Sequence, residues 1–126
     1  MNDAAPDTDF ARALQEHLDA IVARDVARFE ATLGADVVTV DGSGAVTRGT
    51  GAVLASHATW FSTPEPWTFR YEIVLVRETA SAGFGLLRVT YEQGGALSRF
   101  LLSLLFMRDA YGAYKFVYDQ NTPLVR

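Results

Sequence analysis

The spacing of apolar residues changes once along this chain, at Pro66, and this change limits the folds open to it. Before Pro66 apolar residues recur at intervals of three or four, which is typical of amphipathic helices. The first predicted helix begins at Thr8 or Asp9, either of which can cap it, and two shorter helices follow Asp25 and Thr50. One face of the first helix carries Phe10, Leu14, His17, Leu18 and Ile21.

After Pro66 the period becomes two, as in β-strands. Four long segments separated by turn residues would pair as an antiparallel meander, and they cover residues 67–79, 84–93, 97–108 and 114–122. A short hairpin is expected earlier, with its turn at residues 41–44. Helices first and strands last predict the α+β class, with three N-terminal helices packed on a curved antiparallel β-sheet.

The composition sets the scale and excludes several kinds of protein. The chain has 126 residues, which favours a single domain at 8–126 preceded by a flexible tail at 1–7. Cysteine is absent, so thiolate metal sites and cysteine nucleophiles are excluded. The net charge is −4 and Lys115 is the only lysine, so we expect no nucleic-acid partner. Without a signal peptide or a membrane-spanning apolar run, we expect a cytoplasmic protein with no membrane partner.

One predicted strand is apolar on both of its faces. Residues 100–107 are hydrophobic at every position except Ser103. The helices can cover only one face of a sheet, so the other face would lie in water in a monomer. The mean hydropathy of +0.09, high for a small soluble chain, agrees with a second buried face. We therefore expect a homodimer formed through the outer face of the sheet.

Two segments carry a resemblance to a known fold family. The stretch from Gly112 to Thr122 resembles the C-terminal "dGkWkivhDqnT" pattern of bacterial NTF2-like proteins, with Tyr114 and Tyr118 in place of the usual Trp and His. Thr47-Arg48-Gly49, followed by a helix, resembles the "rG-x-x-a-i" helix entry of the same family. The chain is thus similar to the NTF2-like superfamily, including its SnoaL-like, DUF4440 and kinase-II-association-domain groups. The resemblance implies an NTF2-like (cystatin-like) cone.

Comparison with individual groups of this superfamily suggests site residues. Residues 20–42 align without gaps to ketosteroid isomerase, which implies that Asp41 stands at the position of the general base and His17 at that of an oxyanion-hole tyrosine. The second oxyanion donor of that enzyme, a protonated Asp, aligns near Leu104 and is missing. Residues 87–90 resemble the "I-R-I-T" strand of the kinase-II association domain, which implies that Arg88 points into the cone pocket.

Each of these residues also has a purely structural interpretation. Asp41 is a candidate base if desolvation raises its pKa, but Asp-Gly is also a common hairpin turn. His17 can exchange a proton with a ligand or form a hydrogen bond within the core. His57 is a candidate pocket residue or a packing residue at the rim. Arg88 needs an anion, which can be a ligand or an internal partner such as Glu72 or Glu92.

Aromatic and polar residues on the predicted strands and on the third helix complete the candidate site. Tyr118 and Gln120 share strand parity with Tyr114 and Phe116, which predicts that they end an aromatic row inside the pocket. By the same parity Asp119 and Asn121 would be turn or interface residues. The candidate catalytic residues are Asp41 and His17, and the candidate ligand-binding residues are Arg88, Trp60, Tyr118, Gln120, His57 and Tyr71.

These residues support one leading hypothesis and one alternative. The leading hypothesis is a protein that binds a small apolar molecule, with isomerase-, cyclase- or dehydratase-type acid/base chemistry on an apolar carbonyl compound. It predicts no cofactor and no metal, because the two histidines lack metal-ligand spacing. The alternative is a non-catalytic association or oligomerisation module. An open apolar pocket of about 300 Å³ or more would favour ligand binding, and a packed interior with Arg88 paired to a glutamate would favour the module.

Overall fold

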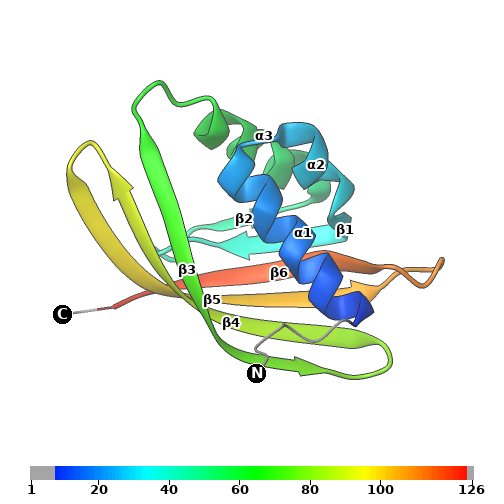
Figure 1. Cartoon of the computed structure of the whole chain (residues 1–126). Coiled ribbons are helices and arrows are strands. Elements are labelled where there is room, and N and C mark those ends of the chain that lie inside the picture. The colour runs from blue at the N-terminus through cyan, green and yellow to red at the C-terminus, as the bar shows by residue number, and fades with distance from the viewer. Residues whose placement is uncertain (1–7, 125–126) are drawn as a thin grey trace.

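The computed structural model describes residues 8–124 and has the predicted α+β class. The predicted flexible tail at 1–7 lies outside the described residues. Three helices and two short strands lead into four long strands (Figure 1). In chain order the elements are α1 (Asp9–Ala23), α2 (Val26–Ala31), β1 (Leu33–Val40), β2 (Val46–Arg48), α3 (Thr50–Phe61), β3 (Trp67–Glu78), β4 (Ala82–Gln93), β5 (Ala96–Arg108) and β6 (Tyr114–Pro123).

Two of the three predicted helix caps are confirmed. The side chain of Thr8 accepts a hydrogen bond from the backbone N–H of Ala11, and that of Asp25 accepts one from Arg28. Thr50 is the first residue of α3 and does not cap it, because Gly49 occupies the cap position without a side-chain hydrogen bond. The Thr50 hydroxyl instead donates to the Gly34 carbonyl at 2.9 Å, which ties the start of α3 to β1.

The six strands form one mixed sheet in the order β2-β1-β6-β5-β4-β3. The predicted antiparallel meander of β3 to β6 is confirmed, and so is the β1–β2 hairpin. The prediction of a wholly antiparallel sheet is wrong at one place, since β1 pairs parallel to β6. The two strands approach closely at Gly34, where an added Cβ would lie 3.0 Å from Cγ1 of Val117. Glycine makes this parallel junction possible.

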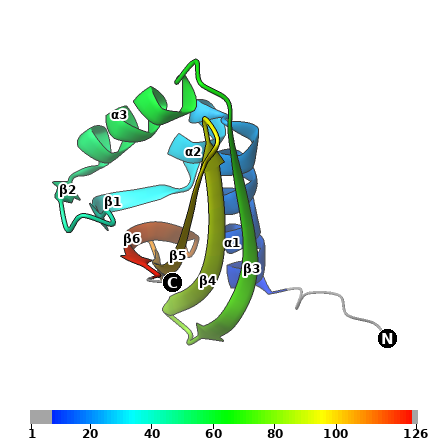
Figure 2. The same cartoon turned by 90° about the vertical axis from the view of Figure 1, so that its left-hand side faces the viewer.

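Helix α1 lies against the concave face of the sheet, which curves around it (Figure 2). Phe10 packs over Gly83 of β4, where any Cβ would clash with its ring. The helix and the sheet close one end of a cone over a set of fully buried rings and His17. We call this set the closed end, and it consists of Phe10, His17, Phe29, Phe106 and Phe116.

A β-bulge in β6 decides which of its side chains face the helices. Leu105 pairs with Tyr118, whereas the next residue of β5, Phe106, pairs with Phe116, so Val117 is an extra residue on β6. A bulge of one residue inverts the alternation of side chains beyond it. Tyr114 and Phe116 therefore face inward before the bulge, and Asp119 and Asn121 face inward after it.

Candidate functional site

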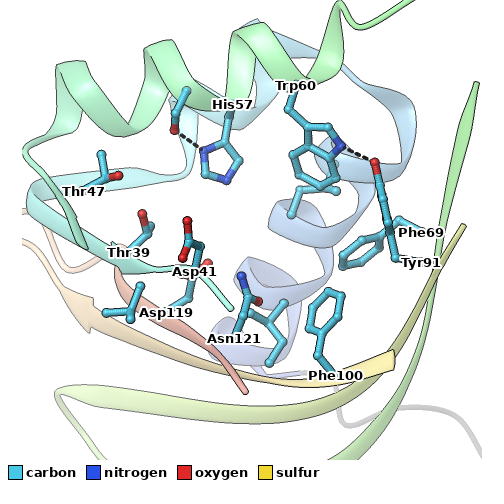
Figure 3. A pocket seen from close by; sticks show the side chains of 14 residues that line it. Thr39, Asp41, Thr47, His57, Trp60, Phe69, Tyr91, Phe100, Asp119 and Asn121 are labelled. Atoms are coloured by element: carbon cyan, nitrogen blue, oxygen red, sulfur yellow. Dashed lines mark hydrogen bonds between the residues drawn. The ribbon is translucent and has the colours of Figure 1, made fainter. Parts of the chain in front are cut away.

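A cavity of about 400 Å³ opens at the end of the cone opposite the closed end. Helix α3 lies along one side of it, and strands from all parts of the sheet form the others (Figure 3). We call this cavity the pocket. Its walls combine aliphatic and aromatic side chains with hydroxyl, carboxyl, amide and imidazole groups. The residues that line it are Ile21, Thr39, Val40, Asp41, Thr47, Ser56, His57, Trp60, Phe69, Tyr91, Phe100, Leu102, Asp119 and Asn121.

One wall of the pocket is a hydrogen-bonded aromatic group. Nε1 of Trp60 donates to the hydroxyl of Tyr91 at 2.9 Å (Figure 3), and that hydroxyl in turn donates to Oε1 of Gln93 at 2.9 Å. Trp60 also stacks on Trp67, with ring centroids 4.6 Å apart. These contacts fix the orientation of the wall. The prediction that Trp60 lines the pocket agrees with its position.

His57 lies on the pocket side of α3 and is held in one tautomer. Its Nδ1 is 2.8 Å from the carbonyl of Val53, and because a carbonyl only accepts, Nδ1 carries the proton. Its ring stacks on Phe29 at 4.3 Å, and burial lowers its pKa below the ordinary value. His57 is therefore neutral at pH 7, and its second nitrogen, Nε2, faces the cavity as an acceptor (Figure 3).

Asp119 brings a buried carboxyl group to the pocket from β6. The residue is 9% exposed, and burial raises its pKa to about 7, although the backbone N–H of Val40 opposes this shift by hydrogen bonding. Asp119 lies beside Thr39 of β1, which in turn lies beside Thr47 of β2. At neutral pH both the acid and the carboxylate form of Asp119 are populated, which suits proton transfer.

On its other side, Asp119 is the cross-strand partner of Leu104. Leu104 is the position at which the resemblance to ketosteroid isomerase implies a protonated carboxyl group. A carboxyl group with a raised pKa thus stands one strand away from that position.

Asp41 lines the pocket but does not have the raised pKa expected of a buried base. Its Oδ1 accepts hydrogen bonds from the backbone N–H groups of Ser43 and Ala45 and from the Ser43 hydroxyl, at 2.7–3.0 Å. These bonds hold its pKa below the ordinary value, with the Ser43 hydroxyl contributing most. Asp41 is exposed and organises the β1–β2 turn, as the structural interpretation of Asp-Gly predicts.

His17 is not part of the pocket, contrary to the prediction that it is catalytic. It is 1% exposed, and its Nδ1 lies 2.8 Å from the hydroxyl of Thr32. Because that hydroxyl donates to the carbonyl of Phe29, it accepts from His17. Burial lowers the pKa of His17 to about 3. His17 is therefore a neutral core residue, as its structural interpretation predicts.

Four further candidates also lie outside the pocket. Arg88 is on the outer face of β4, because its neighbours Leu87 and Val89 are buried on the inner face. It is half exposed and pairs with Glu72 at 3.4 Å, so the prediction that its guanidinium enters the cone is wrong. Tyr71 is on the inner face of β3, but it accepts a hydrogen bond from Gln15 and does not line the pocket.

Tyr118 and Gln120 lie on the outer face because of the bulge at Val117. Their side chains bond to each other there, with the Tyr118 hydroxyl donating to Oε1 of Gln120 at 2.6 Å. The prediction from strand parity is therefore wrong for both. Asp119 and Asn121, which parity assigns to the other face, line the pocket instead. The signal for Asp119 was its place inside a strand of apolar and aromatic residues, where a carboxyl group is costly.

Within residues 8–124, no group of three or more His, Asp or Glu side chains is arranged to hold a metal ion. In the same described part of the chain, no helix is long and apolar enough to cross a membrane. The chemistry that the pocket offers comes from a carboxyl group, an imidazole, hydroxyls and an amide.

Comparison with known proteins gives the family. Residues 11–121 match the model of the SnoaL-like domain family. The chain belongs to this family. No curated protein sequence matches the chain significantly.

Solved structures agree on the fold of this SnoaL-like domain. A protein from Streptomyces avermitilis that is named as a dehydratase of the NTF2-like family has a TM-score of 0.79 at 17% identity, with 94% of this chain and 95% of that chain covered. A protein from Thiobacillus denitrificans that is named as a calcium/calmodulin-dependent protein kinase type II association domain has a TM-score of 0.78 at 19% identity. The match covers 91% of this chain and 94% of that chain. A ketosteroid isomerase-like protein from Erwinia carotovora atroseptica has a TM-score of 0.76 at 18% identity, with 92% of this chain and 94% of that chain covered. These likenesses confirm the predicted NTF2-like, cystatin-like fold.

Proposed function

We propose that this SnoaL-like domain binds a small apolar carbonyl compound in the pocket and transfers a proton on it. The observation that carries the proposal is a carboxyl group with a pKa of about 7, Asp119, in the wall of a cavity of about 400 Å³. Burying an acid costs folding free energy, and here the buried acid meets a space that a ring-sized molecule fills. A proton-transfer group works best when its pKa is close to the working pH.

In the proposed reaction, the carboxylate of Asp119 is the base. It removes a proton from the carbon next to the carbonyl group, and the electron pair of the broken C–H bond moves to the carbonyl oxygen as an enolate. In an isomerisation, a C=C bond next to the enolate shifts into conjugation as Asp119 returns the proton to its far carbon. In a dehydration, the enolate's electron pair forms a C=C bond while the C–O bond at the β-carbon breaks, and the hydroxyl group takes the proton from Asp119 and leaves as water. Asp119 takes over the catalytic role that the sequence assigned to Asp41, whose pKa is lowered.

Neutral donors beside Asp119 complete the proposed site. The hydroxyls of Thr39 and Thr47 and the amide of Asn121 line the same pocket and can donate to the enolate oxygen. His57 offers Nε2 as an acceptor for a hydroxyl group of the ligand. The aromatic wall of Trp60 and Tyr91 covers the apolar body of the ligand and excludes water.

The test follows proton exchange at the α-carbon of a simple bicyclic ketone, 2-tetralone, in D₂O by proton NMR. The protein should accelerate the loss of the α-proton signal above the rate in buffer, and Asp119→Asn should reduce this acceleration on the order of 100-fold. Arg88→Ala is the matched control, since Arg88 lies on the outer face and should leave the rate unchanged. Wild-type exchange no faster than buffer would contradict the proposal, as would an Asp119→Asn variant as active as wild type.

The alternative, a non-catalytic association module, predicts an interior filled by side chains. A cavity of about 400 Å³ exceeds the volume of about 300 Å³ that favours ligand binding. Arg88 does pair with a glutamate, Glu72, which is the second feature expected of the module. This pair lies outside the pocket, however, and leaves the cavity open. Ligand binding is thus the better supported of the two functions.

We also propose that the chain forms a homodimer through the outer face of the sheet. Leu86, Leu101 and Leu105 lie on this face of β4 and β5 and are half-buried in the single chain, while Met107 at its edge is 48% exposed. The ion pair of Arg88 with Glu72 gives the face both signs of charge, which suits contact with an identical copy. A second copy would remove this apolar surface from water.

Sedimentation equilibrium tests the dimer. The expected mass is about twice 13.8 kDa, and Leu101→Glu should shift it to the monomer value. Val46→Glu is the control, because Val46 is exposed on β2, at the other edge of the sheet. A wild-type monomer at micromolar concentration would contradict the dimer without affecting the proposed chemistry of the pocket.

A further inference from the structure

The charged groups that line the pocket all have the same sign. Asp41 stands at the end of β1 and Asp119 in the middle of β6, and none of the lining residues in the described part of the chain is lysine or arginine. Arg88, the cation that the sequence assigned to the pocket, is on the outer face. An anionic ligand would therefore meet like charges and find no cation to pair with.

Most of the hydrogen-bond donors in the pocket wall are already in use. The Trp60 indole donates to Tyr91, and the Tyr91 hydroxyl donates to Gln93. Nδ1 of His57 donates to the Val53 carbonyl, and the hydroxyl of Ser56 donates to the same carbonyl at 3.0 Å. A ligand that needed these donors would have to break bonds within the wall, which costs free energy.

The groups that remain toward the cavity mainly accept hydrogen bonds. Nε2 of His57 is an acceptor, and so are the carboxylates of Asp41 and Asp119. The two threonine hydroxyls and the Asn121 amide can both donate and accept. A ligand that donates hydrogen bonds satisfies this lining better than one that only accepts them.

The aromatic side chains in the pocket wall are a second reason to expect a positively charged ligand. Trp60, Phe69, Tyr91 and Phe100 all line the pocket, on the side away from the threonines (Figure 3). The face of an aromatic ring attracts a cation, and the attraction is stronger where water is excluded. The same rings accommodate the apolar body of a ligand. Carboxylates and aromatic faces together favour an organic cation over a neutral molecule of equal shape.

We propose that the ligand of this pocket carries a protonated amine on an aromatic or alicyclic ring body. The carboxylate of Asp41 binds the ammonium group, and the negative charge of Asp119, which stays free to act as the base, adds to the attraction. This inference rests on the proposed function, in that the pocket must take a small molecule, and it narrows the substrate class to amine-bearing ring compounds. Combined with the proposed proton transfer, it points to amino ketones.

The test uses three probes that share one ring system and differ only in the polar group. They are an amine, 2-naphthylmethylamine, an alcohol, 2-naphthalenemethanol, and a carboxylate, 2-naphthoate. Each is titrated by calorimetry at pH 8 into the full chain in its native oligomeric state. The amine should bind at least about 10-fold more tightly than the alcohol, and the carboxylate should bind most weakly, because a charged pair in a partly buried site is worth about 1.4 kcal/mol or more.

Variants then locate the charge that the amine recognises. Asp41→Asn and Asp119→Asn should each bring the amine's affinity toward that of the alcohol, while the affinity for the alcohol stays the same. Glu30→Gln is the matched control, since it removes one exposed carboxylate from α2, outside the pocket, and should leave the amine preference intact. It separates local recognition from the general attraction of a chain with a net charge of −4.

Each of the other possible outcomes contradicts a different part of the proposal. If the alcohol or the carboxylate binds as tightly as the amine, the charge preference is wrong and the proposed function is unaffected. If the amine is preferred but neither Asp variant changes that preference, the assignment of the two carboxylates is wrong. If none of the three probes binds, the pocket does not take small ring compounds, and the proposed function falls together with the inference.

Discussion

At each end of the cone, burial shifts the pKa of an ionisable side chain in the direction that favours its neutral form. At the closed end, burial lowers the pKa of His17 to about 3. In the pocket, burial raises the pKa of Asp119 to about 7. His17 is enclosed by Phe29, Phe106 and Phe116 and bonds to Thr32, whereas Asp119 borders a cavity. The physical cause is the same, but only Asp119 can exchange its proton with a ligand.

The closed end thus contributes mainly to the stability of the fold, whereas the pocket contributes to its possible function. The closed end gains free energy from ring packing, and its titrating group stays in one protonation state at physiological pH. The pocket loses free energy by desolvating a carboxyl group and by leaving space unfilled. A perturbed pKa is therefore informative about function only together with access to a cavity.

The largest expected effect compares two phenylalanines on the same face of β5. Phe106 belongs to the closed end and is 0% exposed, while Phe100 is half-buried and lines the pocket. Phe106→Ala should lower the free energy of unfolding by about 3–5 kcal/mol, and Phe100→Ala by about 1–2 kcal/mol, because Phe100 already borders empty space. Urea denaturation of both variants gives these values. Equal losses would mean that the two ends are packed alike.

The stability of the protein at low pH tests the lowered pKa of His17 at the closed end. The folded-state pKa of His17, about 3, is below its unfolded value of 6.5, so between these values the unfolded chain binds more protons. Stability should fall as the pH falls from 6.5 toward 3, and His17→Leu should remove roughly 2–4 kcal/mol of this fall. The measurement is the unfolding free energy of both proteins across this range. Parallel pH profiles would show that His17 titrates normally.

Raising the pH tests the pocket, where the predicted change in stability has the opposite sign to that at the closed end. The folded-state pKa of Asp119, about 7, is above its unfolded value of 3.8, so between these values the folded chain binds more protons and stability falls as the pH rises. Asp119→Asn should therefore gain roughly 2–3 kcal/mol relative to wild type between pH 4 and pH 8. The other ionisable side chains that line its pocket are those of Asp41, His57 and Tyr91.

Asp41→Asn provides the matched control for Asp119→Asn. The pKa of Asp41 is lowered in the folded state, so its carboxylate stabilises the turn above its unfolded pKa and loses this effect as the pH falls. Asp41→Asn should therefore lose a little stability at pH 8, where Asp119→Asn gains it. Thermal denaturation at pH 4 and pH 8 compares the two. A shift of the same sign for both variants would contradict the assigned difference between them.

The fold could be predicted from the sequence because its signals are local. The helix face that begins at Phe10, the caps at Thr8 and Asp25, and the turns between the long strands all lie within short stretches of chain. The parallel pairing of β1 with β6 joins residues far apart in the sequence, and no local sequence pattern predicts it. It was therefore the part of the sheet that the sequence did not predict.

The site was harder to predict because it depends on one extra residue. Strand parity counted from Tyr114 places Tyr118 and Gln120 inside, and the bulge at Val117 places Asp119 and Asn121 there instead. His57 and Trp60 both lie on α3 and line the pocket, since a helix keeps its period without such interruptions. Arg88 has the opposite parity to Leu87 and Val89, and its outward direction follows from which face of β4 the helices cover.

The bulge at Val117 has a consequence for how relatives of this domain are compared. Removing Val117 would restore regular pairing and exchange the two sides of the end of β6, so that Tyr118 and Gln120 would replace the acid and the amide in the pocket. A sequence alignment that places a gap one position away from this point would pair pocket residues of one protein with surface residues of another. Relatives should therefore be matched by position after the bulge, counting back from the end of the last strand.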